Sequence, residues 1–436
     1  MPTLMVMTSD FKLLGELPLY TSLQLTRSHY GIGDFELHTH PSAPCASEIA
    51  QGVLLFPSDA PHKCLLIEDV VRNHKEIVTK GCQLKGWARR RICVPPLSLP
   101  TSLWRYSGGA WVQITDAAMI REVMVGDVYQ GYAYPESPEE GMCYLDLSSQ
   151  AALYDWSAGA EQGAVWLDLQ TAQLRSKYQN FGWDRYTGPA ESALKHYALN
   201  NMIAPEDPAR SFPDLICAAD QGRGASLPWQ SRFDKLDDHL SNIGDTTGMG
   251  WDIRPDFTAK KYIFETYPGR NLSTGSRLAV ISTQMGNAAD VETTQTATGS
   301  ATTAYVGGVG EDENRTILAV GNEAAGLDRR ETWVDGGSLD DPEMINMLGL
   351  KKLQDMASGA TMKVTMIDTG ACRYERDWDL GDKVLVKGDN STMAARIISV
   401  KEIYEVDKPR GLEVTFGAAP VTLGKVIRRL DQQTVR

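Results

Sequence analysis

The sequence contains no long apolar run and no secretion signal. No stretch approaches the roughly 18 consecutive apolar residues that a membrane-spanning helix needs. The N-terminal segment 1–10 (MPTLMVMTSD) has neither a basic n-region nor a sustained apolar core. We therefore expect no membrane-spanning segment, and we expect the chain to be made and folded in a bacterial cytoplasm.

Cysteine is scarce and is not spaced for cross-links or for metal binding. The seven cysteines are an odd number and include no C-x-x-C pair, which fits neither a disulfide framework nor a zinc ribbon. We interpret them as buried thiols, the commonest state of a free cysteine. They are Cys45, Cys64, Cys82, Cys93, Cys143, Cys217 and Cys372.

The short motifs of common enzyme classes are also missing. There is no G-x-S-x-G nucleophile elbow, and the glycines at 222–224 and 307–308 lack the context of a phosphate loop. His38 and His40 would share one face of a strand, but no third ligand is identifiable, so we interpret them as polar residues at a strand end. A carboxylate pair for glycoside cleavage stays open, because its separation is a three-dimensional property. We predict no catalytic residue, no cofactor and no metal site.

Positive charge is in the minority. Lys and Arg number 43 against 56 Asp and Glu, and the net charge of −13 disfavours a broad grip on nucleic acid. The run Arg89, Arg90, Arg91 is an exception; on a predicted strand only the first and third would share a side. An intersubunit carboxylate is the favoured partner, ahead of a phosphate backbone. The acidic segment 310–314 (GEDEN) lacks EF-hand spacing, and we interpret it as a solvated hairpin tip.

Short strand patterns separated by turn residues fill most of the chain. At 436 residues the protein should divide into two to four domains. We predict a mainly β fold with α+β parts. Its units are an N-terminal antiparallel β-barrel over 1–95, an inserted β-rich module over 96–184, a small α/β domain over 185–275, and a C-terminal β-barrel with one helix over 276–436.

Two helices are predicted in the small α/β domain. Gly188 and Pro189 mark the start of the first, because proline in a first turn loses no hydrogen bond. The second is predicted to begin at Ser231, with Asp234 in capping-box position. Asp237 and Asp238 on this helix are expected to face solvent.

The C-terminal barrel is predicted from segments that alternate polar and apolar residues. Residues 377–380 (DWDL) have this alternation and are predicted to form a half-buried strand. Trp378 is then expected in the barrel core, with Gly381 and Asp382 at the following turn. Together with Gly188 and Pro189, these are the residues to which we assign a structural role.

Half of the ten tryptophans lie in the segment predicted as an inserted module. Aromatic platforms stack on sugar rings, so contact with a cell-wall glycan is one interpretation. Packing in a core or at a subunit interface is the favoured one. The residues are Trp104, Trp111, Trp156, Trp166 and Trp183.

Several segments in order resemble one known family. Together they look like the baseplate hub, or tail-tip hub, proteins of long-tailed phages and prophages, a group that includes siphovirus tail proteins and tail-associated lysins. The resemblance spans about 33–417 but leaves out about 97–183. The segments are 33–37 (GDFEL), 81–92 (GCQLKGWARRRI), 188–201 (GPAESALKHYALNN), 249–253 (MGWDI), 264–271 (FETYPGRN), 305–309 (YVGGV) and 374–386.

The resemblance implies a structural role in a phage tail. It implies two tail-tube-like barrels in each chain and three chains in a pseudo-sixfold ring that joins the tail tube to the tip. The implied partners are a distal tail protein, a tape-measure protein and a receptor-binding or fibre protein, with DNA only passing through. The implied location is the tail tip of the virion. An acidic channel would let DNA pass without sticking. The competing interpretation is a tail-associated protein that binds cell-wall glycan or hydrolyses peptidoglycan.

Overall fold

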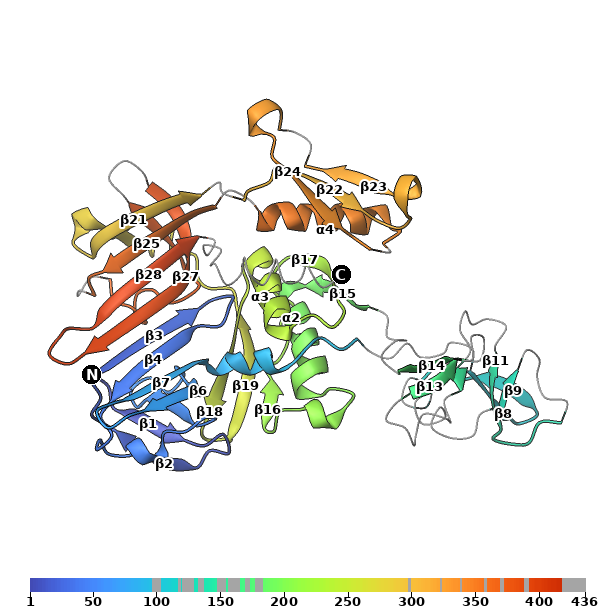
Figure 1. Cartoon of the computed structure of the whole chain (residues 1–436), viewed down its shortest axis with the longest axis horizontal. Helices are drawn as coiled ribbons and strands as arrows, with labels where there is room; N and C mark the ends of the chain where they lie inside the picture. Colours follow the sequence, from blue (N-terminus) through green and yellow to red (C-terminus); the bar gives the residue numbers. More distant parts are fainter. Residues whose placement is uncertain are drawn as a thin grey trace.

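The computed structural model describes most of the chain and shows a mainly β protein (Figure 1). This confirms the predicted β class. No helix in the described part of the chain is both long enough and apolar enough to span a membrane. The described residues are 1–95, 103–116, 119, 129–131, 137–146, 154–155, 165–168, 173–176, 183–296, 299–321, 324–337, 339–356, 359–368, 372–387 and 392–417.

The N-terminal strands form one half of a large antiparallel sheet. Their order is β2, β1, β5, β6, β7, β4, β3. The period-two pattern appears in β3, where Leu23, Leu25 and Arg27 are buried between partly exposed neighbours. The strands are β1 (Leu4–Met7), β2 (Leu13–Leu17), β3 (Ser22–Ser28), β4 (Asp34–Thr39), β5 (Leu54–Pro57), β6 (Leu65–Arg72) and β7 (Ile77–Gln83).

The C-terminal strands continue the same sheet. Strand β27 pairs antiparallel with β3, Ser399 opposite Ser28 and Glu405 opposite Ser22. The path then runs through β28 and β25 to β21, while β26 and β20 branch from β27. These strands are β20 (Val280–Ser282), β21 (Ala288–Thr296), β25 (Gly359–Met366), β26 (Lys383–Lys387), β27 (Thr392–Glu405) and β28 (Gly411–Gly417).

The sheet is therefore shared by the two ends of the sequence. Among the described strands its path ends at β2 on one side and at β21 on the other, and no pairing closes either half into a barrel. Figure 1 shows these two edges at the bottom and the top of the sheet. The two-barrel arrangement stays a prediction, whereas the pairing of β3 with β27 is a feature that the sequence did not predict.

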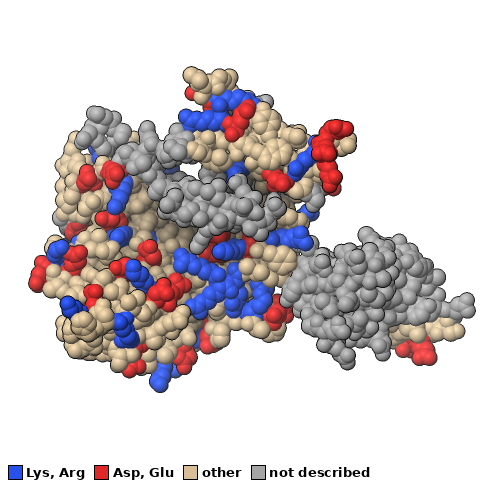
Figure 2. Space-filling view, in the orientation of Figure 1, with Lys and Arg blue, Asp and Glu red and all other residues tan. Residues whose placement is uncertain are grey.

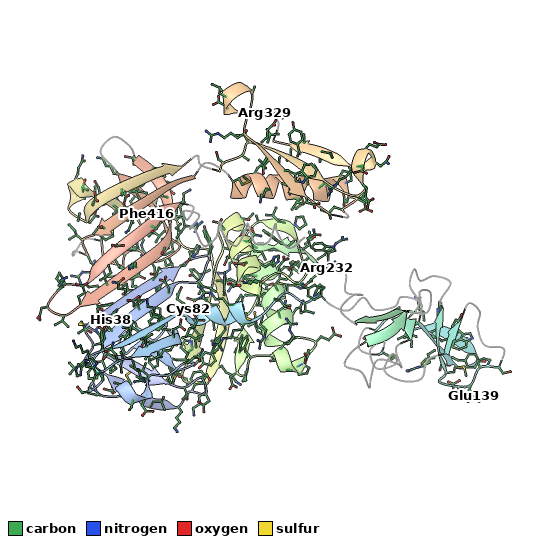
Figure 3. All side chains as sticks on the ribbon, in the orientation of Figure 1. His38, Cys82, Glu139, Arg232, Arg329 and Phe416 are labelled. Carbon is green, nitrogen blue, oxygen red and sulfur yellow. The ribbon has the colours of Figure 1, made fainter. Side chains whose placement is uncertain are left out.

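A mixed α/β unit packs against the N-terminal half of the sheet. Strands β15 (Asp184–Pro189) and β17 (Ser226–Ser231) pair beside helices α2 (Ala190–Ala198) and α3 (Leu236–Thr247). Strands β18 (Gly250–Asp256) and β19 (Lys261–Tyr267) form an antiparallel hairpin, with β16 (Leu215–Cys217) parallel to β19. One apolar core runs through this unit into the sheet. Figure 3 shows Cys82 of that core where the sheet meets the unit.

Two short helical segments complete this unit. The 3₁₀ helix η2 (Leu84–Arg90) leaves β7 and packs on α3 and β18. A π-helical turn, η6 (Leu199–Ile203), follows α2 directly and buries Asn201 and Met202. The segment η7 (Pro208–Arg210) comes next in the chain.

A second, smaller α/β unit lies beyond α2 and α3 in Figure 1. Strand β22 (Thr303–Gly307) lies between β23 (Ile317–Val320) and β24 (Glu331–Asp335). Helix α4 (Pro342–Asp355) packs against these strands and begins with a proline, which loses no hydrogen bond at a first helical position. The buried residues are Ala304, Val306, Val320, Val334 and Ile345.

The described parts of the segment 96–184 form two small sheets to the side of the molecule (Figure 1). Of its tryptophans, Trp111 contacts the rings of Tyr106 and Tyr144, and Trp183 is 41% exposed. Trp156 lies outside the described residues. The strands are β8 (Leu103–Ser107), β9 (Ala110–Gln113), β10 (Tyr129–Gly131), β11 (Cys143–Asp146), β12 (Tyr154–Asp155), β13 (Val165–Asp168) and β14 (Gln173–Ser176).

Four local predictions are wrong. Residues 377–380 lie in a turn, because Glu375 takes the left-handed φ of 65° and the Asp377 carboxylate accepts the Arg373 N–H. Arg89 and Arg90 end the 3₁₀ helix η2 and Arg91 caps it, instead of forming a strand; residues 84–88 of this helix are all buried.

The second helix of the α/β unit starts at Leu236, not at Ser231. The Ser231 hydroxyl does donate to the Asp234 carboxylate, at 2.8 Å, but Phe233 has a φ of 61° and keeps the segment out of the helix. Asp237, expected at the surface, is 6% exposed.

Candidate functional site

Three of the five predicted structural residues meet where the two halves of the sheet and the α/β unit come together. Trp378, Gly381 and Asp382 lie in the connection that precedes β26. A hollow of about 400 Å³ opens beside them. It is lined by Tyr267, Pro268, Gly269, Arg270, Glu375, Asp379, Leu380 and Asp382. We call this region the sheet junction.

Asp382 holds the loop after β19 onto the start of β26. Its carboxylate accepts the backbone N–H of Arg270 at 2.7 Å and the Arg270 guanidinium Nη2 at 2.6 Å. It also accepts the backbone N–H of Asp379 at 2.9 Å. The Asp382 side chain is only 3% exposed, whereas that of Arg270 is 51% exposed, and the bidentate geometry of the pair holds the two loops together.

Gly381 permits a close approach between the connection and β3. It has a φ of 90°, which favours glycine, and a Cβ at this position would lie 2.5 Å from the ring of His29. The Gly381 N–H donates to the Ile397 carbonyl, and its carbonyl accepts Arg396 Nη1 at 2.6 Å. The turn is therefore fixed by backbone conformation, by packing and by hydrogen bonds together.

His29 is a buried residue that the sequence analysis missed. It is 0% exposed, and its Nε2 lies 3.3 Å from the Gly248 carbonyl of the α/β unit. Burial lowers the pKa of His29 to about 3, and the nearby Arg396 adds to this effect. The imidazole is thus neutral at physiological pH and acts as a packing group between three parts of the chain.

Trp378 anchors the C-terminal half of the junction. It is 0% exposed, its indole N–H donates to the Cys372 carbonyl, and its ring lies 4.9 Å from that of Tyr374. The Tyr374 hydroxyl accepts a hydrogen bond of 2.8 Å from Arg27 of β3. Burial raises the pKa of Tyr374 well above its ordinary value, so the hydroxyl stays protonated.

A buried ionic layer joins the two halves beside this aromatic pair. Lys63 contacts Glu402 at 2.6 Å and Glu375 at 2.9 Å, and Arg410 contacts Glu402 at 2.9 Å. The side chains of Glu402 and Lys63 are 0% and 3% exposed. A charge this deeply buried is tolerated only with its partner, so the layer favours one arrangement of the two halves.

The carboxylates of the junction are suited to holding the structure together. Burial tends to raise the pKa of Glu375, but hydrogen bonds and charge from His62, Lys63 and Arg27 hold it at about 2. Glu375 is therefore ionised at neutral pH, whereas the general acid of a glycosidase needs a raised pKa. The groups around this hollow pair with one another and with backbone.

Gly188 and Pro189 lie apart from this junction, at the end of β15. Pro189 has a φ of −57° and occupies the cap position of α2, one residue before the helical position expected for it. A Cβ on Gly188 would lie 2.9 Å from the Tyr186 ring. In the first turn of α2, Glu191 is 0% exposed and pairs with Lys195 and Arg223.

His38 and His40 form hydrogen bonds with different residues. His38 lies between Glu36 and Glu76, at 2.7 and 2.8 Å, while His40 contacts the Ser42 hydroxyl at 2.6 Å. Within the described residues, no group of three or more His, Cys, Asp and Glu is arranged to hold a metal ion.

Sequence reasoning missed Arg27, Lys63 and Glu402 because single buried charges carry no motif. A signal existed for Arg27: it continues the buried phase of Leu23 and Leu25. An inward-pointing arginine in a strand demands a buried acceptor. No local pattern indicates Tyr374, 347 residues away, as that acceptor.

The fold and the junction define a multi-sheet structural protein. The sequence matches the family described as Siphovirus ReqiPepy6 Gp37-like protein over residues 169–418, more than half of its length. The chain belongs to this family of siphovirus tail proteins, which confirms the resemblance stated from the sequence segments.

Solved structures of phage tail proteins are similar to this chain at low identity. The prophage MuSo2 43 kDa tail protein from Shewanella oneidensis is 11% identical, with 95% of this chain and 98% of that chain covered and a TM-score of 0.47. The tail protein from Neisseria meningitidis MC58 is 10% identical, with 96% and 97% covered and a TM-score of 0.49. Prophage tail protein gp18 from Listeria monocytogenes EGD-e is 10% identical, with 99% of both chains covered and a TM-score of 0.46. No curated protein matches the chain.

Proposed function

We propose that the protein is a structural hub of the tail tip, in which three copies form a ring that joins the tail tube to the tip and the receptor-binding parts. One observation carries the proposal beyond the family. The sheet shared by the two ends of the chain leaves β2 and β21 as described edges at its opposite ends. An edge strand offers unpaired N–H and C=O groups to a further strand. Different edges meeting head to tail form a heterologous contact, which closes into a ring when the rotation permits.

In this proposal each half of the sheet contributes one barrel-like, tube-facing element. Three copies then supply six such elements around the axis, the number that a sixfold tube requires. The junction built by Asp382, Gly381 and the ionic layer holds the two elements of one chain at a fixed angle. This role involves no catalysis, and the side chains described at the junction hold the two elements in place.

The proposed neighbours are a distal tail protein, a tape-measure protein and a fibre or receptor-binding protein, and the proposed location is the tail tip of the virion. DNA is proposed only to pass through the ring. The net charge of −13 supports this, because a surface that repels phosphates does not retain DNA in transit.

The domain organisation is also proposed as 1–95, 96–184, 185–275 and 276–436. The first and last of these units share one sheet, and strands β8 to β14 of the second pair only with one another. Limited proteolysis should therefore release fragments cut within 96–184 while 1–95 and 276–436 stay associated. Separation of the two halves after such a cut contradicts this organisation.

The test of the hub is the mass of the purified protein by light scattering, with negative-stain images of the same sample. We expect a particle of about 144 kDa, three times the 48.0 kDa chain, with a central opening. A monomer at all concentrations, both alone and with the neighbouring tail proteins, refutes the proposal.

A further inference from the structure

A basic hollow stands out on this acidic protein. It has a volume of about 320 Å³ and is lined by Arg89, Arg90, Arg91, Ile92, Arg210 and Lys235. Figure 2 shows Lys and Arg gathered on the face over η2 and the start of α3. Five cations around one hollow contrast with a chain that carries thirteen more acidic than basic residues. We call it the basic groove.

Three segments distant in sequence build the groove. Ile92 forms an antiparallel bridge with Lys235, and the Leu236 N–H donates to the Arg91 carbonyl at 3.1 Å. Arg210, at the end of η7, donates from Nη2 to the Ile92 carbonyl at 2.7 Å. Backbone pairing thus brings the cations together in a fixed arrangement, which lowers the entropy cost of binding an anion.

The side chain of Arg91 is held in place next to other cations. Arg91 lies over the Phe212 ring at 4.1 Å and donates to the Arg210 carbonyl at 2.7 Å. Burial lowers the pKa of Arg91, as do the charges of Arg210 and Arg90, so the guanidinium groups repel one another. A bound carboxylate would relieve that repulsion.

Arg89 has acidic neighbours in the groove. Its guanidinium lies 3.6 Å from Glu68 and 3.8 Å from Asp237. Arg90 and Lys235 form no ion pair with any residue that the structure describes. These two exposed cations are therefore the ones most available to a partner.

A matching anionic element lies elsewhere on the same chain. Glu311, Asp312 and Glu313 are all exposed at the tip of the hairpin formed by β22 and β23, and no ion pair within the described residues involves them. The Gly308 N–H donates to the Thr316 carbonyl at 2.7 Å, so the tip has a defined base. We call it the acidic tip.

The groove and the tip of one chain do not meet in this structure. In Figure 2 the blue groove lies on the body of the molecule, while a red cluster lies at the far end of the unit formed by β22 to β24 and α4. Two complementary surfaces that cannot meet within one chain can meet between copies. Such a contact joins different surfaces, as a ring requires.

We propose that the basic groove of one copy receives the acidic tip of a second copy. The inference rests on the proposed ring and names one of its contacts. Glu311 and Glu313 pair with Arg90 and Lys235, while Arg91 is already held in place by Phe212. Duplex DNA is the disfavoured occupant, because Glu68 and Asp237 lie next to Arg89 and repel a long polyanion.

Charge reversal on the full-length protein tests the contact. The groove variant carries Arg90→Glu and Lys235→Glu, and the tip variant carries Glu311→Lys and Glu313→Lys. All four side chains are exposed, so the fold should survive. We expect each variant alone to dissociate the ring into single chains in light scattering, and we expect the two changes in one chain to restore it.

A matched control separates this contact from the effect of overall charge. The control variant carries Lys75→Glu and Lys260→Glu, which change the net charge as much as the groove variant does. Both sites are exposed and form no ion pair with any described residue. This variant should remain a ring. The wild-type ring should also weaken as salt is raised, because exposed charge pairs are screened.

A cross-link provides a second readout. Chains with Lys235→Cys are mixed with chains carrying Asp312→Cys and are then mildly oxidised. We expect a disulfide-linked pair only in the mixture, with neither variant forming that pair alone.

Each result decides the proposal. A wild-type ring that persists in both reversed variants, with no disulfide in the mixture, overturns the contact and leaves the hub intact. A wild-type chain that never assembles overturns both. Duplex DNA binding at physiological salt that the groove variant loses, with the ring unaffected, assigns the groove to nucleic acid and overturns the proposal.

Discussion

Gly381 provides the sharpest test of the sheet junction, because Gly275 offers a matched control. The two residues have φ values of 90° and 89°. A Cβ on Gly381 would lie 2.5 Å from the His29 ring, whereas nothing lies within 4 Å of one on Gly275. Substitution by alanine therefore adds the same backbone strain at both sites and a steric clash at only one.

The expected difference follows from these two contributions. A left-handed φ costs a residue with a Cβ about 1–2 kcal/mol, so Gly275→Ala should destabilise by that amount. Overpacking adds about 1–3 kcal/mol, so Gly381→Ala should lose about 2–5 kcal/mol in total. His29 cannot move away easily, because it is fully buried between β3 and the α/β unit.

Scanning calorimetry on both variants makes the comparison. For a unit of this size about 1 kcal/mol corresponds to about 2–4 °C in Tm, so Gly381→Ala should unfold several degrees below Gly275→Ala. Gly381→Val should be worse still. Equal unfolding temperatures for the two alanine variants would refute the close approach and, with it, the role assigned to Gly381.

Three further predictions concern buried polar groups and the start of α2. The pKa of His29 is lowered in the folded chain, so between about pH 6.5 and pH 3 the unfolded chain binds a proton that the folded chain does not. The free energy of unfolding should therefore fall by up to about 1.4 kcal/mol per pH unit as the pH drops. An acid titration in which His29→Gln has the same dependence of stability on pH would argue against this. Glu402→Gln should lose up to about 3–5 kcal/mol in urea unfolding, because the buried Lys63 then keeps only Glu375 as an ionic partner and Arg410 loses its contact with the Glu402 carboxylate. A loss no larger than that of the exposed pair variant Glu405→Gln would contradict this. Gly188→Ala should cost less in Tm than Gly381→Ala, because its Cβ meets only the far end of a partly exposed Tyr186 ring.

Local periodicity predicted the parts of the fold that depend on neighbouring residues. The mainly β class and the start of α2 next to Pro189 follow from side-chain spacing and from proline geometry. Predictions failed where one local pattern is compatible with two different structures. The alternation of residues 377–380 fits a strand, but a left-handed Glu375 forms a turn and still buries Trp378.

Local sequence patterns did not predict which distant residues contact those of the site. Glycine at 381 predicts positive φ, and the structure places it there, but nothing near it in sequence indicates His29 as its neighbour. The ionic layer similarly pairs Lys63 with Glu402 across 339 residues. The groove arginines were visible as a run, while Arg210 and Lys235 join them only through tertiary structure.

The pairing of β3 with β27 also sets an order of events during synthesis. Residues 22–28 leave the ribosome early, yet their partner strand spans residues 399–405, so β3 has an open edge until nearly all of the described chain has been made. Such late, non-local pairing slows folding and exposes a strand to the wrong partner. Many nascent copies lie close together on a polysome. The inward-pointing Arg27 disfavours pairing of β3 with a strand of another copy, because its charge has no buried partner on the core face until Tyr374 has been synthesised.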